Sequence, residues 1–379
     1  MRIAVPAEND PSEHRVAATP DTVKRFVALG AEVVVQTRAG MQSGIRDEDY
    51  KTAGASIGDS AEATIRDADV VLRVRRPSAE DLNGIKQGAL VIAIMDPYGN
   101  TSALKALAER GASTFSMELM PRITRAQSMD VLSSQANIAG YRAVVDAAAE
   151  FGRAMPMMMT AAGTVPAAKA FIMGVGVAGL QAIATARRLG AIVTATDVRP
   201  ATKEQVESLG AKFIAVENEE FKAAETSGGY AKEMSDEYKK AQNELTMSHI
   251  AKQDIVITTA LIPGRPAPKL ITAAMVASMK PGSVIVDLAV ERGGNCELAR
   301  PGETFVSENG VKIVGNLNVA GRLPATASAL YAKNLYTFVE TFIDKQTKAL
   351  NVPWDDEIVK ATLLTKDGKL VHPNFQDAA

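Results

Sequence analysis

The sequence contains few of the residues that metal and thiol-based redox sites require. Its 379 residues include one cysteine, Cys296, and three widely separated histidines, His14, His249 and His372. A single cysteine excludes an internal disulfide and a zinc site built on several thiolates, and it fits a reducing compartment. Scattered histidines argue against a histidine-rich metal site. We therefore interpret Cys296 as a small buried residue and expect no metal.

A strong net charge and a long unbroken apolar run are also absent. Lys plus Arg total 42 against 44 Asp plus Glu, so the net charge of −2 provides no broad basic field for nucleic acid or anionic lipid. The opening "MRIAVPAEND" has no secretory signal pattern, and the apolar stretch 170–186 is interrupted by glycines. These absences favour small ligands and predict no nucleic-acid partner and no direct membrane insertion.

Short apolar runs alternate with amphipathic helical stretches along most of the chain. This alternation predicts parallel sheets covered by helices. We expect two Rossmann-like α/β domains with parallel sheets, joined by long helices at 133–155 and 329–346, with the first domain discontinuous. The expected domains are 1–137 plus 327–379, and 138–326. Strands are expected at 2–6, 31–35, 69–74, 89–95, 169–173, 191–196, 212–216, 254–259, 283–288 and 312–315, and a hairpin turn at Asp367–Gly368.

The segment "KAFIMGVGVAGLQAIATARRLGAIVTATD" places Gly174, Gly176 and Gly179 as G-x-G-x-x-G between an expected strand and an expected helix. In that context the first glycine permits a tight turn, the second lets the backbone approach a pyrophosphate, and the third lets helix and strand pack closely. The phosphate would meet the free N–H groups at the helix N-terminus. A glycine turn that merely joins strand and helix is the weaker interpretation.

Asp197 ends the second strand, where an acid hydrogen-bonds the adenosine ribose and repels a 2′-phosphate. Arg199 complicates this inference because a nearby arginine can accommodate that phosphate. We favour NAD(H) because the acid is retained. The candidate cofactor contacts in this region are Gly174, Gly176, Val177, Gly179, Asp197, Val198 and Arg199.

A second polar segment, "RAQSMDVLSSQ" at 125–135, contains no histidine or cysteine. One interpretation is structural, since Thr124 and Gln127 match a capping box at the start of a solvated helix. The other is hydride transfer, in which a nicotinamide performs the chemistry and the protein only orients it. Amide, hydroxyl and carboxylate side chains suit that task.

These motifs resemble those of the NAD(H)-binding component, the soluble alpha-1 chain, of proton-translocating NAD(P) transhydrogenases. The resemblance covers essentially the whole chain, through "ENDPSEHRVAATP", "MELMPRITRAQSMDVLSSQANIAGYRAV", "PMMMTAAGTVPAAKAFIMGVGVAGLQAIATARRLGA", "GGYAKEM" and "VIVDLAVERGGNCE". It implies direct, Si/Re-specific hydride exchange between NAD(H) on this chain and NADP(H) on a partner subunit. A membrane-embedded proton-channel subunit would couple the exchange to proton movement.

The resemblance also implies roles for individual residues. Arg122, Gln127, Asp130 and Ser133 become the nicotinamide and ribose contacts, with Gln127 nearest the incoming NADP(H). Gly229 and Tyr230 become part of a loop that closes over the nucleotide. A homodimer is implied, docked as a peripheral subunit on the cytoplasmic face of a bacterial inner membrane.

Alanine dehydrogenase is the nearest enzymatic alternative. Arg15 matches its substrate-carboxylate arginine, but Arg75 stands in the place of its catalytic lysine, and Met95 and Asp96 follow the fourth strand where its histidine is expected. Arginine stays protonated and is a poor proton shuttle. Glu291 departs from that enzyme's pattern as well. We therefore expect Arg15 to be structural and paired with a carboxylate. A noncatalytic NAD-sensing subunit is the third hypothesis.

Overall fold

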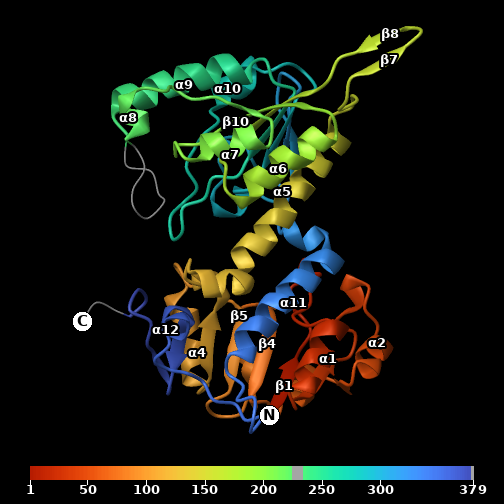
Figure 1. Cartoon of the computed structure of the whole chain (residues 1–379), viewed down its shortest axis with the longest axis vertical. Helices are drawn as coiled ribbons and strands as arrows, with labels where there is room; N and C mark the ends of the chain where they lie inside the picture. The colour runs from red at the N-terminus through yellow and green to blue at the C-terminus, as the bar shows by residue number, and fades with distance from the viewer. Residues whose placement is uncertain (224–233, 377–379) are drawn as a thin grey trace. The chain divides into compact units, whose positions relative to one another are not determined.

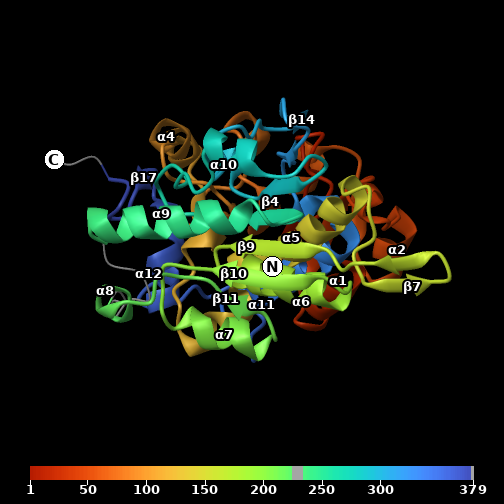
Figure 2. The same cartoon turned by 90° about the horizontal axis from the view of Figure 1, so that it is seen from above.

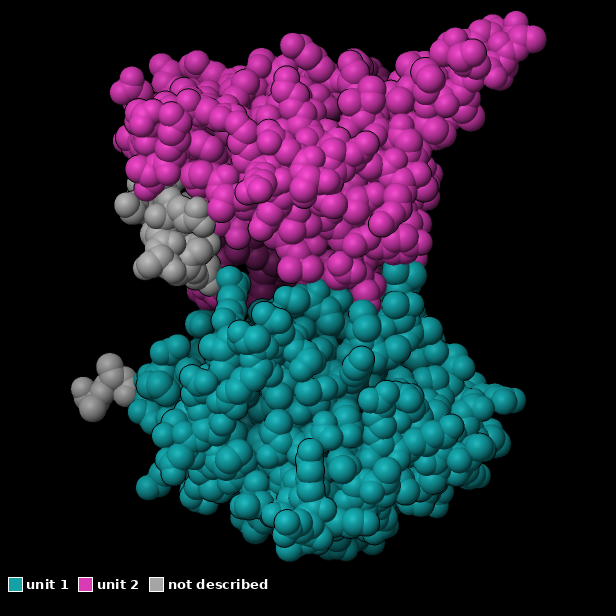
Figure 3. Space-filling view, in the orientation of Figure 1, with its two compact units in different colours: residues 1–135, 320–379 teal, residues 136–319 magenta. Residues whose placement is uncertain are grey.

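The computed structural model describes residues 1–223 and 234–376, and the chain divides into two compact units (Figure 3). Unit 1 comprises residues 1–135 and 320–379, and unit 2 comprises residues 136–319. The domain boundaries predicted from the sequence were 137 and 327. Helix α5 (Val131–Glu150) begins in unit 1 and continues into unit 2.

Unit 1 is built on an eight-stranded sheet in the order β17-β16-β6-β5-β4-β1-β2-β3. The strands from β6 to β3 in this order pair in parallel, whereas β16 pairs antiparallel with both β6 and β17. Because the C-terminal β16 pairs with β6, both ends of the chain contribute to one sheet, which confirms the predicted discontinuous α/β fold. The strands are β1 (Arg2–Val5), β2 (Glu32–Gln36), β3 (Ser56–Gly58), β4 (Val70–Arg75), β5 (Leu90–Ile94), β6 (Ser113–Ser116), β16 (Leu363–Lys366) and β17 (Lys369–Leu370).

Helices cover the sheet of unit 1, and α11 carries the longest apolar face among those lying wholly within this unit. That helix starts at Pro324, where proline is tolerated because the first N–H groups have no intrahelical partner. Its buried Tyr331, Leu335 and Phe338 belong to the same core cluster as β1 and β4. The helices are α1 (Pro20–Ala28), α2 (Asp47–Thr52), α3 (Ala61–Ile65), α4 (Thr101–Glu109), α11 (Pro324–Glu340) and α12 (Glu357–Thr362), with 3-10 turns η1 (Met41–Ser43), η2 (Glu80–Leu82), η3 (Met117–Leu119), η4 (Thr124–Met129) and η6 (Ala320–Arg322) (Figure 1).

Unit 2 contains a seven-stranded sheet in the order β11-β10-β9-β12-β13-β15-β14, in which only the edge strand β14 pairs antiparallel. Viewed as in Figure 2, α9 and α10 lie on one face of this sheet and α6 and α7 on the other. The strands are β7 (Met158–Thr160), β8 (Gly163–Val165), β9 (Lys169–Met173), β10 (Ile192–Thr196), β11 (Lys212–Phe213), β12 (Ile255–Thr258), β13 (Val284–Asp287), β14 (Thr304–Val306) and β15 (Lys312–Val314). The helices are α6 (Val177–Arg188), α7 (Thr202–Ser208), α8 (Glu219–Lys222), α9 (Asp236–Ile250) and α10 (Ala273–Ser278), with the 3-10 turn η5 (Val290–Arg292).

The central strands are apolar on both faces, as parallel strands covered by helices must be. In β12, Ile255 and Ile257 pack into one core cluster and Val256 into the other, following the two-residue period of a strand. The two faces of the sheet in unit 2 are thus buried separately.

Several parts of the fold differ from the sequence-based expectation, including the short strands β3 and β14, which were not expected. The expected strand 212–216 is reduced to the two residues of β11. Strand β6 was not expected because its sequence, Ser-Thr-Phe-Ser, is polar, yet all four residues are buried. The hydroxyls of Thr114 and Thr365 satisfy each other there, 2.8 Å apart. The protruding hairpin β7–β8 was not expected either.

The predicted turn at Asp367–Gly368 is confirmed between β16 and β17. Asp367 has φ 50° and Gly368 has φ 75°. Positive φ at both central residues is the property of the two-residue turn that matches strand twist, and Asp-Gly favours it.

Candidate functional site

The predicted glycine loop lies between β9 and the first turn of α6, at the carboxyl edge of the sheet in unit 2. Gly174 has φ 99°, and a Cβ added there would lie 2.6 Å from Thr259 Oγ1. The Thr259 hydroxyl donates to Gly174 O at 3.0 Å, so the loop after β12 holds the glycine turn in place. Glycine is required here by both backbone conformation and space.

Gly176 and Gly179 have different structural roles. Gly176 is the N-cap residue of α6 and provides no side-chain cap, and a Cβ there would meet nothing within 4 Å. A Cβ on Gly179 would lie 1.9 Å from Gly174 O, so this glycine lets the helix pack against the turn. The loop therefore brings the uncapped N–H groups of α6 to an open space. Such groups attract an anion.

A glycine in α5 also supports this helix, and sequence analysis did not single it out. A Cβ on Gly140 would lie 2.1 Å from the carbonyl oxygen of Ala178, in the first turn of α6. The two helices therefore cross at backbone contact within unit 2. The available signal was an isolated glycine inside an Ala-rich helical segment, which often marks a close packing position.

The carboxylate of Asp197 is engaged on both oxygens. It accepts the backbone N–H of Val175 at 2.7 Å, and from Arg199 it accepts the backbone N–H, Nε and a terminal nitrogen, each at 2.9 Å. Arg199 also donates to Val175 O at 3.1 Å. Asp197 and Arg199 thus pin the glycine loop to the end of β10. A ribose hydroxyl would have to share or displace one of these bonds.

A further loop, residues 260–268, completes the same edge. Residues 261–266 are all exposed, including the apolar Leu261 and Ile262. The buried Asn295 anchors this loop, because its side chain accepts from Ala260 N at 3.0 Å and donates to the carbonyls of Ala260 and Pro268. Sequence analysis did not identify Asn295, whose role depends on a backbone approach that no motif records.

In unit 1, the polar segment forms η4 and the start of α5. The capping box of Thr124 and Gln127, which was the structural interpretation of this segment, is not formed. The residue preceding η4 is Ile123, which makes no side-chain cap bond. Asp130 stands immediately before α5 instead, and its carboxylate accepts from Ser133 N at 2.9 Å and from Ser133 Oγ at 2.5 Å. This is the bonding of an N-cap residue to the third helical position.

The four candidate nicotinamide contacts differ in burial. Asp130 and Ser133 are half-buried and bonded to each other, whereas Arg122 and Gln127 are exposed. Within residues 1–223 and 234–376, no hydrogen bond is made by the side-chain amide of Gln127. Its donor and acceptor are available to a ligand.

The carboxyl edge of the sheet in unit 1 is filled with charged side chains. The buried Arg15 binds Glu13 through Nε at 2.7 Å and through a terminal nitrogen at 2.6 Å, and it donates to Gln135 Oε1 at 2.8 Å. Arg75 Nε binds the same Glu13 carboxylate at 2.7 Å. The expectation that Arg15 pairs with a carboxylate is confirmed, and Arg75 binds the same Glu13 carboxylate.

Burial and nearby charges have opposing effects on the pKa values of Glu13 and Glu8 at this edge. Burial favours a raised pKa for Glu13, but the hydrogen bonds and charges of Arg15 and Arg75 outweigh it, so the pKa of Glu13 is lowered. For Glu8, burial dominates over the nearby Arg73, and its pKa is raised. Glu8 accepts the backbone N–H groups of Val74 and Arg75, so it closes the end of β4.

Other sequence-based expectations concern loops, metals and the membrane. Gly229 and Tyr230 lie outside the described residues. In the described part of the chain, no group of three His, Cys, Asp or Glu side chains is placed to hold a metal ion. None of the helices described here has both the length and the apolar character needed to cross a membrane.

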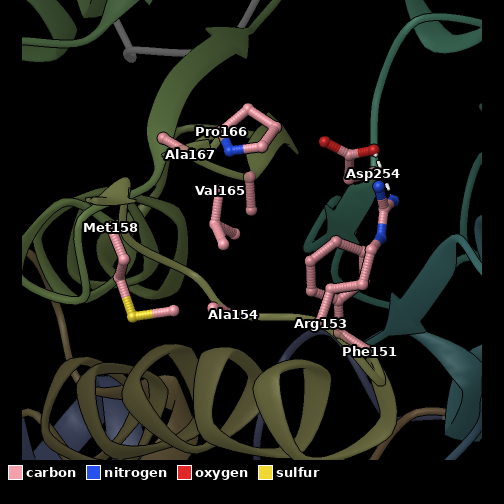
Figure 4. A pocket seen from close by; sticks show the side chains of 9 residues that line it. Phe151, Arg153, Ala154, Met158, Val165, Pro166, Ala167 and Asp254 are labelled. Carbon is pink, nitrogen blue, oxygen red and sulfur yellow. Dashed lines mark hydrogen bonds and ion pairs between the residues drawn. The ribbon is translucent and has the colours of Figure 1, made fainter. Parts of the chain in front are cut away.

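The opposite, amino-terminal edge of the sheet in unit 2 carries a small pocket of about 320 Å³ (Figure 4). Asp254, which precedes β12, accepts from Arg153 at 2.8 Å and from Lys169 N at 2.9 Å. The other lining residues are mostly apolar and include Phe151, Met158 and Val165. The pocket is therefore separate from the glycine loop, which follows the carboxyl end of β9.

A glycine loop against an uncapped helix, with an acid at the end of the next strand, defines a dinucleotide-binding α/β protein of the Rossmann type. Two family models extend this conclusion. The N-terminal domain of "Alanine dehydrogenase/PNT" matches residues 4–139, and the C-terminal domain matches residues 143–373. The chain therefore belongs to the alanine dehydrogenase/PNT family.

Within this family, the chain is more similar to transhydrogenase components than to alanine dehydrogenases. It is 56% identical to the first segment of NAD(P) transhydrogenase subunit alpha from Rhodospirillum rubrum, over 98% of each chain. A solved transhydrogenase structure from Sinorhizobium meliloti has 61% identity and a TM-score of 0.89, covering 98% of this chain and 100% of that one. Alanine dehydrogenase of Halomonas elongata is 30% identical, over 100% of this chain and 96% of the relative. These similarities confirm the resemblance inferred from the motifs.

Proposed function

We propose that this chain is the NAD(H)-binding component of a proton-translocating NAD(P) transhydrogenase, in which hydride passes directly between NAD(H) on this chain and NADP(H) on a partner subunit. The observation that carries the proposal is the open glycine loop, where a Cβ on Gly176 would meet nothing within 4 Å. The similarity to the transhydrogenase alpha chain of Rhodospirillum rubrum, over nearly the whole of both chains, supports it. We propose unit 1 and unit 2 as its two domains, with unit 2 the NAD(H)-binding one.

The residues present fit a dinucleotide. The N–H groups of α6 and of the glycine loop would hold the pyrophosphate, with Val177 and the exposed Val198 beside it. Asp197 would bind the ribose, with Arg199 as its neighbour. When bound, the nicotinamide supplies the hydride chemistry. We include Gly229 and Tyr230 among the contacts because the motif "GGYAKEM" supports them.

No general acid or base is assigned in this proposal, because a hydride passes between two rings. The protein has to hold the rings at near-contact, about 3 to 3.5 Å apart, and exclude water. Gln127 is the best suited to orient a carboxamide because its amide is exposed and unbonded within the described residues. Asp130 caps α5 and holds Ser133, and Arg122 provides a cationic contact.

The assembly is included in the proposal. We place proton translocation in a membrane-embedded partner, and this chain as a peripheral subunit on the cytoplasmic face of a bacterial inner membrane. A homodimer is supported by three exposed methionines at the β7–β8 hairpin: Met157, which precedes β7, and Met158 and Met159 within it. Exposed apolar side chains gathered on one element commonly mark a protein contact. We also propose that the hydride exchange is Si/Re-specific.

An alanine dehydrogenase activity is the alternative, and the contacts at the filled edge of unit 1 disfavour it. Arg15 and Arg75 both bind Glu13, and neither arginine can shuttle a proton. Imine chemistry requires acid–base catalysis. A noncatalytic NAD-sensing role is disfavoured by the exposed Gln127, which adenine and phosphate recognition does not require.

One experiment separates these functions. The purified chain is mixed with NADH and an NADP⁺ analogue, with and without an NADP(H)-binding transhydrogenase subunit, and is tested separately with pyruvate and ammonia. Hydride exchange only in the mixture is expected. Reduction of pyruvate by the chain alone would replace the proposal with the alternative, and NADH binding without exchange would favour the sensor.

Gln127→Asn tests the proposed orienting role. The shorter amide keeps both hydrogen-bonding groups but loses alignment, so the hydride-transfer rate should fall about 10-fold or more while NADH affinity changes little. Stopped-flow single turnovers give the rate, and fluorescence titration gives the affinity. Equal losses of rate and affinity would contradict the role.

A further inference from the structure

The buried face of α11 is apolar except at a few polar positions, and each of these bonds a different segment of unit 1. Ser328 Oγ accepts Val16 N at 3.0 Å, in the segment that follows β1. Tyr331 OH donates to Arg73 O at 2.9 Å, in β4. Asn334 contacts the polar segment that forms η4 and the start of α5. A polar group buried in an apolar interface costs free energy unless it makes a hydrogen bond. These hydrogen bonds therefore fix the position of each segment against the helix.

The side-chain amide of Asn334 donates one hydrogen bond and accepts another. Its Nδ2 donates to Ser128 O at 2.8 Å, and its Oδ1 accepts from Ser134 Oγ at 2.7 Å. The residue is 7% exposed, so the bonds are shielded from water. One rigid amide therefore joins the end of η4 to the first turn of α5.

The two bonded residues adjoin the candidate nicotinamide contacts on both sides of the turn. Ser128 follows Gln127 directly, and Ser134 follows Ser133 directly. Between them, Asp130 caps α5, and Ser134 N donates to Asp130 O at 3.2 Å. The Asn334 side-chain amide therefore fixes both the turn capped by Asp130 and the direction of the backbone at Gln127.

We propose that Asn334 is a positioning residue for hydride transfer, and that its side-chain amide sets the placement of the Gln127–Ser133 turn without touching the cofactor. The inference rests on the proposed function. Hydride transfer is sensitive to sub-ångström placement, whereas affinity for NADH comes mainly from the nucleotide contacts at the glycine loop. Loss of the amide should therefore act on rate far more than on binding.

The test uses the full chain with an NADP(H)-binding transhydrogenase subunit and the variants Asn334→Ala, Ser134→Ala and Ser134→Thr. Single-turnover hydride transfer should slow about 10- to 100-fold in Asn334→Ala and less in Ser134→Ala, while the Kd for NADH stays within about twofold. Ser134→Thr retains the hydroxyl and should transfer hydride at nearly the wild-type rate.

Ser328→Ala is the matched control. It removes two buried hydrogen bonds from the same helix, but these reach Val16, in the segment that follows β1, and Ser43, in η1. Its melting temperature should fall, as it should for Asn334→Ala, while its rate stays near that of the wild type. Amide hydrogen exchange of the peptide 127–135 should accelerate in Asn334→Ala and Ser134→Ala but not in Ser328→Ala.

Unchanged transfer in a folded Asn334→Ala or Ser134→Ala variant would overturn the inference, as would parallel losses in rate and NADH affinity. An equal slowing in Ser328→Ala would also overturn it, because general destabilisation would then explain the effect. Failure of the proposed function is distinguishable, since the wild-type mixture itself would then show no hydride exchange.

Discussion

The two sheets of this protein present opposite kinds of carboxyl edge. In unit 2, the glycine loop, the Asp197–Arg199 pair and an exposed loop follow the strand ends, and a Cβ on Gly176 would meet nothing within 4 Å. In unit 1, the corresponding edge is occupied by the chain's own charged side chains, with Glu13 held by Arg15 and Arg75. Ligands of open α/β sheets bind at this edge. The same architecture can therefore leave this edge open as a binding surface or fill it with the protein's own side chains.

The largest expected effect is at the filled edge. Glu13→Gln leaves the buried Arg15 without its charged partner, and breaking a buried ion pair typically costs about 3 to 5 kcal/mol. Urea unfolding should show that loss, while NADH affinity of the folded variant stays near that of the wild type. A variant as stable as the wild type would mean that the filled edge is not held together by this carboxylate.

The same pair predicts an acid dependence. Because the pKa of Glu13 is lowered by folding, its contribution is present above the unfolded pKa, near 4.5, and is lost as the pH falls through the lower folded value. Unfolding free energies measured from pH 6 to about pH 3 should thus fall less steeply in Glu13→Gln than in the wild type. Glu8 acts with the opposite sign, because its pKa is raised.

At the open edge, two glycine substitutions should separate binding from folding. Gly176→Ala places a Cβ in free space and should fold normally, yet weaken NADH binding roughly 100-fold, or about 2.8 kcal/mol, by blocking the approach of the pyrophosphate. Gly179→Ala forces a Cβ against Gly174 O and should also cost about 1 to 3 kcal/mol of stability. Calorimetry and NADH titration measure the two quantities. If Gly176→Ala bound NADH as tightly as the wild type, the open edge would be excluded as the NADH site.

Asp197→Asn should have an intermediate effect. It removes the negative charge that holds Arg199, so NADH binding should weaken about 10-fold and discrimination against NADPH should relax as the guanidinium becomes available to a 2′-phosphate. Titration with both nucleotides measures the ratio of affinities. If that ratio stays at the wild-type value, Asp197 does not determine specificity.

The smallest effect is expected at an exposed ion pair on the polar segment of unit 1. Arg125 binds Asp356 at 2.8 Å with both side chains partly in solvent, so Asp356→Asn should change stability by less than about 1 kcal/mol. Asparagine also remains a good N-cap for α12. A much larger loss in thermal unfolding would show that a surface pair can matter as much as the buried pair of Glu13.

The glycine turn of the open edge was predictable from sequence, whereas at the filled edge only the pairing of Arg15 with a carboxylate was predicted. Gly174, Gly179 and Asp197 follow from a motif whose spacing has a local physical cause. In the polar segment, a capping box of Thr124 and Gln127 was one of two interpretations of the sequence, but Asp130 caps the helix instead, because a 3-10 turn precedes it. Asn295 and Asn334 act on residues far away in the sequence, and one chain without an alignment contains no signal for such pairs.

The bond between Asp197 and Val175 N has a consequence for engineering cofactor preference. Replacing the acid at the end of the second strand is the usual route to a phosphate-tolerant enzyme, but here that carboxylate also fastens the turn that receives the pyrophosphate. Any substitution of Asp197 would therefore loosen the glycine turn at the same time as it changed the preference between NADH and NADPH. The neighbouring Val198 is more than half exposed, so a substitution there would leave the bond between Asp197 and Val175 N in place.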